Sequence, residues 1–263
     1  MGCNSIMDDT IYDIHGLLSS IENEDHEIIA KYKYNRDGTL KSSESYSFNY
    51  NPNEWASFTY TYDSNGRLIK KEGFQPGNML MSSIRGAADA NVTAQYQYNS
   101  KGLVEAINFD FQYEEYSDIN YTSHLGYEYP EEDTVIERYN IVDPAANSIS
   151  TAKEYHYNNA GNIEEVITYT ENNTDGKRIL SKEEYTFDDM NKPVAFEPTP
   201  QSANNVLTMN ITAYNYAENG NQSVAYTSTY TYEYEYNKNG YPEKVSETFP
   251  NEYTEVKYYN YIK

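Results

Sequence analysis

A short aromatic turn pattern recurs along the chain and constrains its fold more than any other feature. The clearest copy is Tyr60-Thr-Tyr-Asp-Ser-Asn-Gly66, in which two tyrosines precede a turn sequence that ends in glycine. Looser copies begin at Tyr32, Tyr96, Tyr155, Tyr185 and Tyr234. Residues two apart in a strand share a face, so each aromatic pair predicts a strand with both rings on one side.

The residues after each aromatic pair predict a tight turn. Asn or Asp comes first, and its side chain can accept a hydrogen bond from the backbone two residues further on. A glycine three residues later suits the left-handed conformation that closes a type I turn with a bulge. Asn191 replaces that glycine in one copy, and asparagine tolerates a positive φ best among the other residues. The pattern therefore predicts six β-hairpins.

The strand after each turn starts two residues beyond the glycine. Four copies have an apolar residue at this place, and the other two have Pro193 and Pro242. Proline cannot donate a hydrogen bond to a neighbouring strand, so we expect an unpaired position here, as in a bulge beside the turn.

The repeat divides the chain into two parts. Residues 1–25 lie outside it and form a tether, in which the spacing of apolar residues predicts a short amphipathic helix over residues 8–23. Residues 26–263 form one repeat-built domain. The expected hairpins and strands are 32–48, 54–74, 91–114, a decayed copy at 118–142, 152–170, 177–196, 206–216 after a loop at 198–205, 223–249, and a closing strand at 252–262.

About 12 to 16 strands joined by short turns predict an all-β, antiparallel, up-and-down meander. A meander has two edge strands, and closure into a barrel protects them most completely. A barrel that spans lipid needs an apolar outer band about 25 Å tall. Here Tyr, Phe and Ile alternate with Lys, Glu, Ser and Thr, which leaves no fully apolar face. We therefore expect a closed or nearly closed water-soluble barrel with its tyrosine-rich face inward.

Composition excludes several classes of function. The net charge of −22 argues against nucleic acid and against anionic membrane surfaces, since both bind basic patches. One cysteine cannot form an internal disulfide framework or a cysteine-rich metal site. No run of residues approaches the roughly 20 apolar residues of a membrane helix. The 31 tyrosines suit wide sheets with one wet face, because each combines a strand-forming ring with a hydroxyl.

No catalytic, cofactor-binding or metal-binding pattern is present. The histidines His15, His26, His124 and His156 lack the spacing of metal ligands, and we expect His156 to face solvent between two inward tyrosines. No nucleophile elbow, P-loop or Rossmann glycine pattern occurs. We therefore expect a protein that is not an enzyme and has no cofactor. Acidic pairs such as Asp188-Asp189 leave a carboxylate-based hydrolase as an alternative.

Two residues are candidate functional positions. Gly2-Cys3 matches the last two residues of a bacterial lipobox, in which the cysteine carries the lipid anchor. Trp55, the single tryptophan, begins a predicted strand. An exposed Trp55 could stack on a sugar ring, whereas a buried one would belong to the core, which is the commoner environment of tryptophan.

Two family resemblances follow from these motifs. The frame Tyr-Asp-x-x-Gly-Arg-Leu at 62–68 resembles the YD repeat of RHS proteins, the β-shells that enclose toxins. Six copies without a further C-terminal domain leave nothing to enclose. Residues 26–263, together with Cys3, are also similar to Bacteroides lipoproteins with degenerate copies of this repeat. That resemblance implies a porin-like barrel and a lipid-anchored location at the outer membrane, the cell surface or the periplasm, but no activity.

Three functions remain open. The first is a non-catalytic surface or periplasmic lipoprotein module that binds a glycan, a peptide or a partner protein through tyrosine-rich loops or the barrel mouth. The second is an RHS-like structural shell or assembly component. The third is a hydrolase with carboxylates at the barrel mouth, which predicts a cluster of inward acids. We expect membrane contact only through the lipid anchor, and no nucleic-acid partner.

Overall fold

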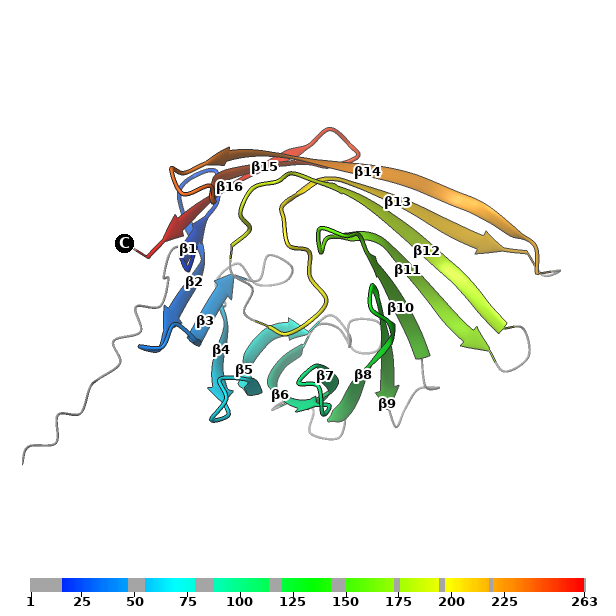
Figure 1. Ribbon diagram of the computed structural model, residues 1–263, viewed down its shortest axis with the longest axis horizontal. Coiled ribbons are helices and arrows are strands. Elements are labelled where there is room, and N and C mark those ends of the chain that lie inside the picture. The colour runs from blue at the N-terminus through cyan, green and yellow to red at the C-terminus, as the bar shows by residue number, and fades with distance from the viewer. Residues whose placement is uncertain are drawn as a thin grey trace, which may run out of the picture.

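In the computed structural model, sixteen antiparallel strands form one closed barrel (Figure 1). Each strand pairs with the next along the chain, and β1 pairs with β16 to close the sheet. The structure describes residues 16–46, 55–78, 88–113, 120–142, 150–172, 176–193, 197–217 and 220–262. The prediction of an all-β, up-and-down, closed barrel is confirmed.

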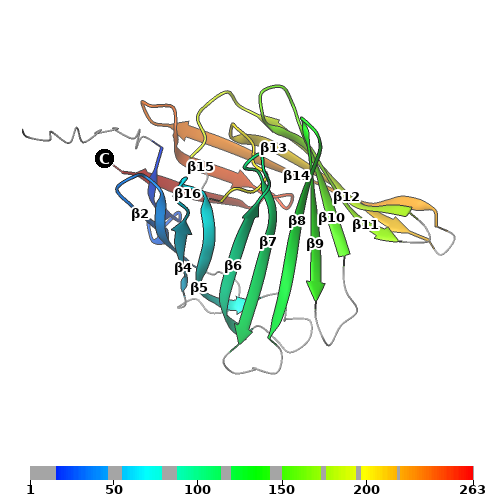
Figure 2. The same cartoon turned by 60° about the horizontal axis from the view of Figure 1, so that its bottom comes forward.

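The strands differ in length around the barrel. The first eight are β1 (Leu18–Glu22), β2 (Ile28–Tyr34), β3 (Leu40–Tyr46), β4 (Trp55–Tyr62), β5 (Leu68–Asn78), β6 (Ala88–Tyr98), β7 (Val104–Tyr113) and β8 (Tyr121–Glu131). The others are β9 (Thr134–Val142), β10 (Ser150–Tyr157), β11 (Ile163–Asn172), β12 (Gly176–Phe187), β13 (Val206–Tyr216), β14 (Gln222–Tyr236), β15 (Pro242–Thr248) and β16 (Thr254–Tyr261). Figure 2 shows β6–β9 as a tall wall, with β11–β14 projecting to one side.

Five of the six predicted turns have one geometry. In the copy at Asp63, the Gly66 N–H donates to the Asp63 carbonyl at 3.0 Å, and the Asp63 side chain accepts from the N–H of Asn65 at 2.9 Å. The closing glycines Gly38, Gly66, Gly102, Gly161 and Gly240 all have φ between 75° and 81°. The predicted bulge is present beside each of these turns. One of these bulges lies at Pro242, which is the first residue of β15, as expected.

A tyrosine hydroxyl ties six of the strands to the strand before them, and in three of these strands the tyrosine is the second one of the repeat. The Tyr62 hydroxyl on β4 donates to the carbonyl of Leu40, the first residue of β3, at 2.9 Å. Tyr98 on β6 does the same to Leu68 of β5 at 2.7 Å. The same bond joins Tyr34 to Leu18, Tyr129 to Val104, Tyr234 to Val206 and Tyr261 to Pro242. These bonds fix the tyrosine rings at the end of the barrel where the repeat turns lie.

The hydrophobic core lines the inner face of strands β5–β8. Its main cluster joins Leu68, Tyr96, Ile107 and Tyr127, which come from four consecutive strands, β5 to β8. A second cluster around Phe111 lies on the same wall and includes its stacked neighbour Tyr121, 4.6 Å between ring centroids. Packing thus rigidifies β5–β8, the wall on which part of the candidate site is built.

The predicted N-terminal helix is wrong for its second half. Leu18–Glu22 forms strand β1, which pairs with β16 and β2, so the barrel begins before residue 26. Residues 8–15 of that prediction lie outside the described residues. Where the structure describes the chain, no helix long and apolar enough to span a membrane occurs.

The predicted hairpin at 177–196 is also wrong. Strand β12 ends at Phe187, and neither Asn191 nor Pro193 lies in a strand. Asn191 does not have the expected positive φ, which among described non-glycine residues occurs only at His26 and Glu252. The turn is closed later by Asn205, whose carbonyl accepts from the Asp188 N–H at 3.1 Å. The residues between them are therefore an insertion into an otherwise ordinary repeat turn.

Candidate functional site

The inserted segment crosses the inside of the barrel. We call residues 188–193 and 197–205 the strap; it is the yellow-green segment between β12 and β13 in Figure 1. At its far point, a Glu197 carboxylate oxygen lies 2.5 Å from Lys71 Nζ on β5. The Tyr96 hydroxyl on β6 donates to the other oxygen at 3.2 Å. The strap thus reaches the wall opposite its own strands.

Both ends of the strap are fixed to repeat turns. On one side, the Ala203 N–H donates to the Gly161 carbonyl at 3.1 Å, and the Ile163 N–H donates to Ser202 Oγ at 3.0 Å. On the other side, the Asn191 N–H donates to the Gly240 carbonyl at 3.2 Å. The strap therefore lies at the turn end of the barrel. It is held by the β10–β11 turn, by the β14–β15 turn and, through Glu197, by strands β5 and β6.

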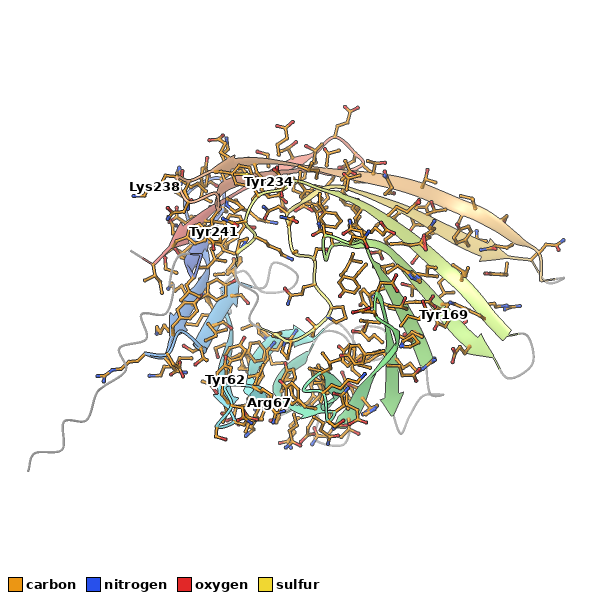
Figure 3. All side chains as sticks on the ribbon, viewed as in Figure 1. Tyr62, Arg67, Tyr169, Tyr234, Lys238 and Tyr241 are labelled. Carbon is orange, nitrogen blue, oxygen red and sulfur yellow. The ribbon has the colours of Figure 1, made fainter. Side chains whose placement is uncertain are left out.

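A cavity of about 370 Å³ lies between the strap tip and the β2–β3, β4–β5 and β6–β7 turns. Its lining includes Tyr62, Arg67, Tyr98 and Glu197. Figure 3 shows Tyr62 and Arg67 near one another on the β4–β5 side of the barrel. We call this space the turn cavity.

The aromatic rings of the turn cavity are held rigidly. The hydroxyls of Tyr62 and Tyr98 are bonded to backbone carbonyls, as described above. The Arg67 guanidinium carbon lies 4.9 Å from the centre of the Tyr98 ring, and Arg67 Nη2 lies 2.7 Å from Asp63 Oδ2. The cavity therefore offers fixed aromatic surface beside one guanidinium and the Glu197 carboxylate.

A second cavity, of about 280 Å³, lies where the strap leaves the β12–β15 wall. Its lining includes Tyr185, Tyr232, Tyr234, Tyr259 and Lys192. Lys192 Nζ lies 3.5 Å from the Ser202 carbonyl, and burial lowers the pKa of its ammonium group. Lys192 also lines a third space, of about 380 Å³, beside Glu197. A single lysine therefore borders the second and the third space.

Tyrosine hydroxyls inside the barrel donate to carboxylates. The Tyr127 hydroxyl donates to Glu137 at 2.9 Å, and Tyr232 donates to Glu247 at 3.2 Å. Burial raises the pKa of Tyr127, and the nearby Glu137 raises it further. Tyr185 donates to Glu183 and Tyr236 donates to Asp188 in the same way. These four phenols are therefore neutral donors that are already paired.

Trp55 lies away from these cavities. It begins β4 as predicted, is half-buried, and shares the outer face with Tyr46, whose ring centroid lies 5.8 Å away. Lys31 Nζ lies 5.1 Å from the centre of its ring. The inward positions of β4 are the alternate residues, such as Tyr60. Trp55 is thus neither a core residue nor part of the interior site.

Among the remaining sequence candidates, His124 and His156 line none of these cavities. Cys3 lies outside the described residues. His156 is partly exposed, as predicted, and its Nε2 lies 3.0 Å from Glu154. His124 bonds Asn108 at 2.8 Å. Within the described residues, no group of three or more His, Cys, Asp or Glu side chains could hold a metal ion.

The loop predicted at 198–205 is part of the strap, but its extension back to Asp188 and its path across the barrel were not predicted from the sequence. One signal was present, because residues 198–217 contain no charged residue in a chain that is 23% charged. A second signal was the long sequence separation between Asp188 and Asn205, because aspartate and asparagine both favour turns. Neither signal indicates where the strap goes, since Lys71 lies 126 residues away in sequence from Glu197.

Comparison with known proteins supports the fold. A porin-like protein from Bacteroides vulgatus ATCC 8482 has a TM-score of 0.54 and 11% identity, over 94% of this chain and 99% of that one. TcdB2-TccC3-TEV gives a TM-score of 0.34 at 12% identity, over 86% of this chain and 12% of that one. A porin-like protein from Bacteroides uniformis ATCC 8492 gives a TM-score of 0.30 at 11% identity, over 77% of this chain and 100% of that one. No family model and no curated protein matches the chain. The first similarity makes the barrel porin-like in fold.

Proposed function

We propose that this chain is a non-catalytic module that binds a glycan inside the barrel, in the turn cavity. The observation that carries the proposal is the fixed pair of rings, Tyr62 and Tyr98, beside Arg67 and Glu197. Sugar rings pack on aromatic faces while their hydroxyls bond to charged and polar side chains. Because the tyrosine rings are already immobilised, binding costs little side-chain entropy.

Two variants of the turn cavity test this proposal. Arg67→Ala removes a charged hydrogen-bond donor and Glu197→Gln removes a negative charge, and we expect each change to weaken binding about tenfold, or about 1.4 kcal/mol. A broad glycan array identifies the ligand, and calorimetric titration of the hit with wild type and variants gives the affinities. Trp55→Ala is the control and is expected to bind like wild type.

Two outcomes would overturn the glycan site. One is a broad array without any hit. The other is a hit whose binding is lost in Trp55→Ala but kept in Arg67→Ala and Glu197→Gln, which would move the site to the outer face. Normal thermal unfolding of each variant excludes loss of the fold as the cause.

The outer wall supports a barrel that faces water. Arg138 pairs there with Glu128 at 3.0 Å and with Glu171 at 2.7 Å, and Lys177 pairs with Glu154 at 2.5 Å. Glu128, Arg138 and Glu154 each lie next to an inward tyrosine in their strand. A band of ion pairs is costly in lipid, where an arginine or lysine on the outer face of a barrel costs about 2–4 kcal/mol at the bilayer midplane.

A lipid anchor at Cys3 would place such a barrel at the outer membrane, the cell surface or the periplasm. The proposal is supported by the lipobox-like Gly2-Cys3 and by the outer wall just described. Fatty-acid labelling of the full-length precursor in its native bacterium tests it. We expect label in wild type and none in Cys3→Ala, and an unlabelled wild type would contradict the anchor.

The two alternatives have less support. An RHS-like shell needs an open interior, and the strap crosses it from β12 to Lys71. A carboxylate hydrolase has candidates in Glu137 and Glu183, which both act electrostatically on Tyr155. Each of these carboxylates already accepts a tyrosine hydrogen bond. We therefore favour binding over hydrolysis.

A further inference from the structure

Lys192 on the strap forms no ion pair with a carboxylate of the described residues. The hydrogen bond that it does form is long, 3.5 Å from Nζ to the Ser202 carbonyl. Two other lysines of the interior are paired, Lys71 with Glu197 at 2.5 Å and Lys257 with Glu247 at 3.3 Å. Lys192 therefore carries a positive charge that the described part of the chain does not neutralise.

The charge of Lys192 is also partly withdrawn from water. The side chain is half-buried, and burial lowers the pKa of its ammonium group. An ammonium group that leaves water without a counter-ion is unfavourable, whereas a charge-assisted hydrogen bond to an anion is strong. The second cavity, which Lys192 lines, therefore favours a negatively charged group beside this lysine.

The rest of the lining of the second cavity offers little to a polar ligand. The hydroxyls of Tyr185, Tyr232 and Tyr234 already donate to other groups of the protein. The side-chain nitrogen of Asn205 donates within the strap. The other lining residues are Pro193, Val206, Pro242, Val245 and Tyr259. The cavity thus combines one cation with a mostly apolar surface.

The volume of the second cavity limits the size of its ligand. An apolar cavity of about 150 Å³ accommodates benzene. The second cavity measures about 280 Å³. It has room for a fused pair of rings, or a chain of similar size, with one acidic group attached.

We propose that the second cavity binds a small organic acid, whose carboxylate pairs with Lys192 and whose apolar body packs on the tyrosine, valine and proline side chains. A sugar would leave most of its hydroxyls without partners against this lining, so the site differs in chemistry from the proposed glycan site. It also differs in place, because no described residue lines both the second cavity and the turn cavity.

Calorimetric titration with matched probes tests the proposal. The probes are 2-naphthylacetate, which has an aromatic body, decanoate, which has an aliphatic one, and the amides of both, which lack the charge. We expect wild type to bind at least one of the two acids, and its amide at least tenfold more weakly. Lys192→Met should weaken binding of that acid at least tenfold. Lys238→Met is the control and should bind like wild type, because Lys238 is exposed and points away from the barrel (Figure 3).

Acetylation of lysine amines provides a second readout in the unmodified chain. The bound acid should protect Lys192 from acetylation and leave Lys238 unaffected, as measured by peptide mass spectrometry. Thermal unfolding checks the fold of Lys192→Met, which we expect to be at least as stable as wild type because it lacks the unpaired charge.

Three results would overturn the organic-acid site. One is a folded wild type that binds neither acid. Another is an acid that binds Lys192→Met as tightly as wild type. The third is a bound acid that leaves the acetylation of Lys192 unchanged, since its carboxylate must then lie elsewhere.

Discussion

Raising the pH above 10 should unfold the barrel abruptly, while the exposed ion pairs of its outer wall contribute little to the change. The cause is the set of buried phenols that line the interior. Burial raises the pKa of Tyr60 to about 12, despite the lowering effect of its hydrogen bond with Ser43. Burial raises the pKa of Tyr96, and the Glu197 carboxylate raises it further. Burial also raises the pKa of Tyr127, and the Glu137 carboxylate adds to that rise.

A raised tyrosine pKa lowers stability as pH increases. Above pH 10 the unfolded chain releases the phenol protons, whereas the folded chain keeps them. The stability from Tyr60 is complete below pH 10 and is lost as pH rises toward about 12. Each such tyrosine changes the unfolding free energy by about 1.4 kcal/mol per pH unit in this range. Three of them give about 4 kcal/mol per pH unit, against a typical total of about 5–15 kcal/mol.

Denaturant unfolding at a series of pH values measures this slope. Tyr127→Phe removes one buried phenol, so we expect its slope to be shallower by about 1.4 kcal/mol per pH unit. The control Tyr226→Phe removes a phenol that is 58% exposed, and its slope should match wild type. Tyrosinate absorbance should rise together with loss of the fold. Smooth ionisation near pH 10 in a chain that stays folded would contradict the account.

The repeat could be predicted from sequence because its physics is local. Asp63 and Gly66 lie within one turn, and the hydrogen bonds that select them join residues a few positions apart. The inward face of Tyr60 and Tyr62 follows from strand alternation alone. Protection of edge strands then predicted closure, although the number of strands stayed between 12 and 16.

The features that sequence did not predict depend on distant residues. Leu18 fits a helical spacing with Ile14 and Ile21, but its structure is set by pairing with Tyr261 at the far end of the chain. The candidate site is a stronger example. Glu197 lies in an insertion without local pattern, and its position depends on Lys71 of another hairpin. Trp55 was chosen for its residue type, which carries no information on the face it occupies.

The proposed glycan site depends on the strap, because the strap forms one side of the turn cavity. A zero-length carbodiimide reagent joins lysine amines to carboxylates that are already in contact. We expect it to link Lys71 to Glu197, whose charged atoms lie 2.5 Å apart. Glu197→Gln should abolish this link completely, since an amide does not react.

Peptide mass spectrometry of the cross-linked protein is the measurement that tests this most directly. Lys177–Glu154 and Lys244–Glu235, at 2.5 and 2.6 Å, are positive controls on the outer wall. We expect an isopeptide between Lys71 and Glu197 in wild type, at a yield comparable to the controls. Links at both outer pairs with none between Lys71 and Glu197 would show that the strap does not cross the barrel, and the proposed glycan site would fall with it.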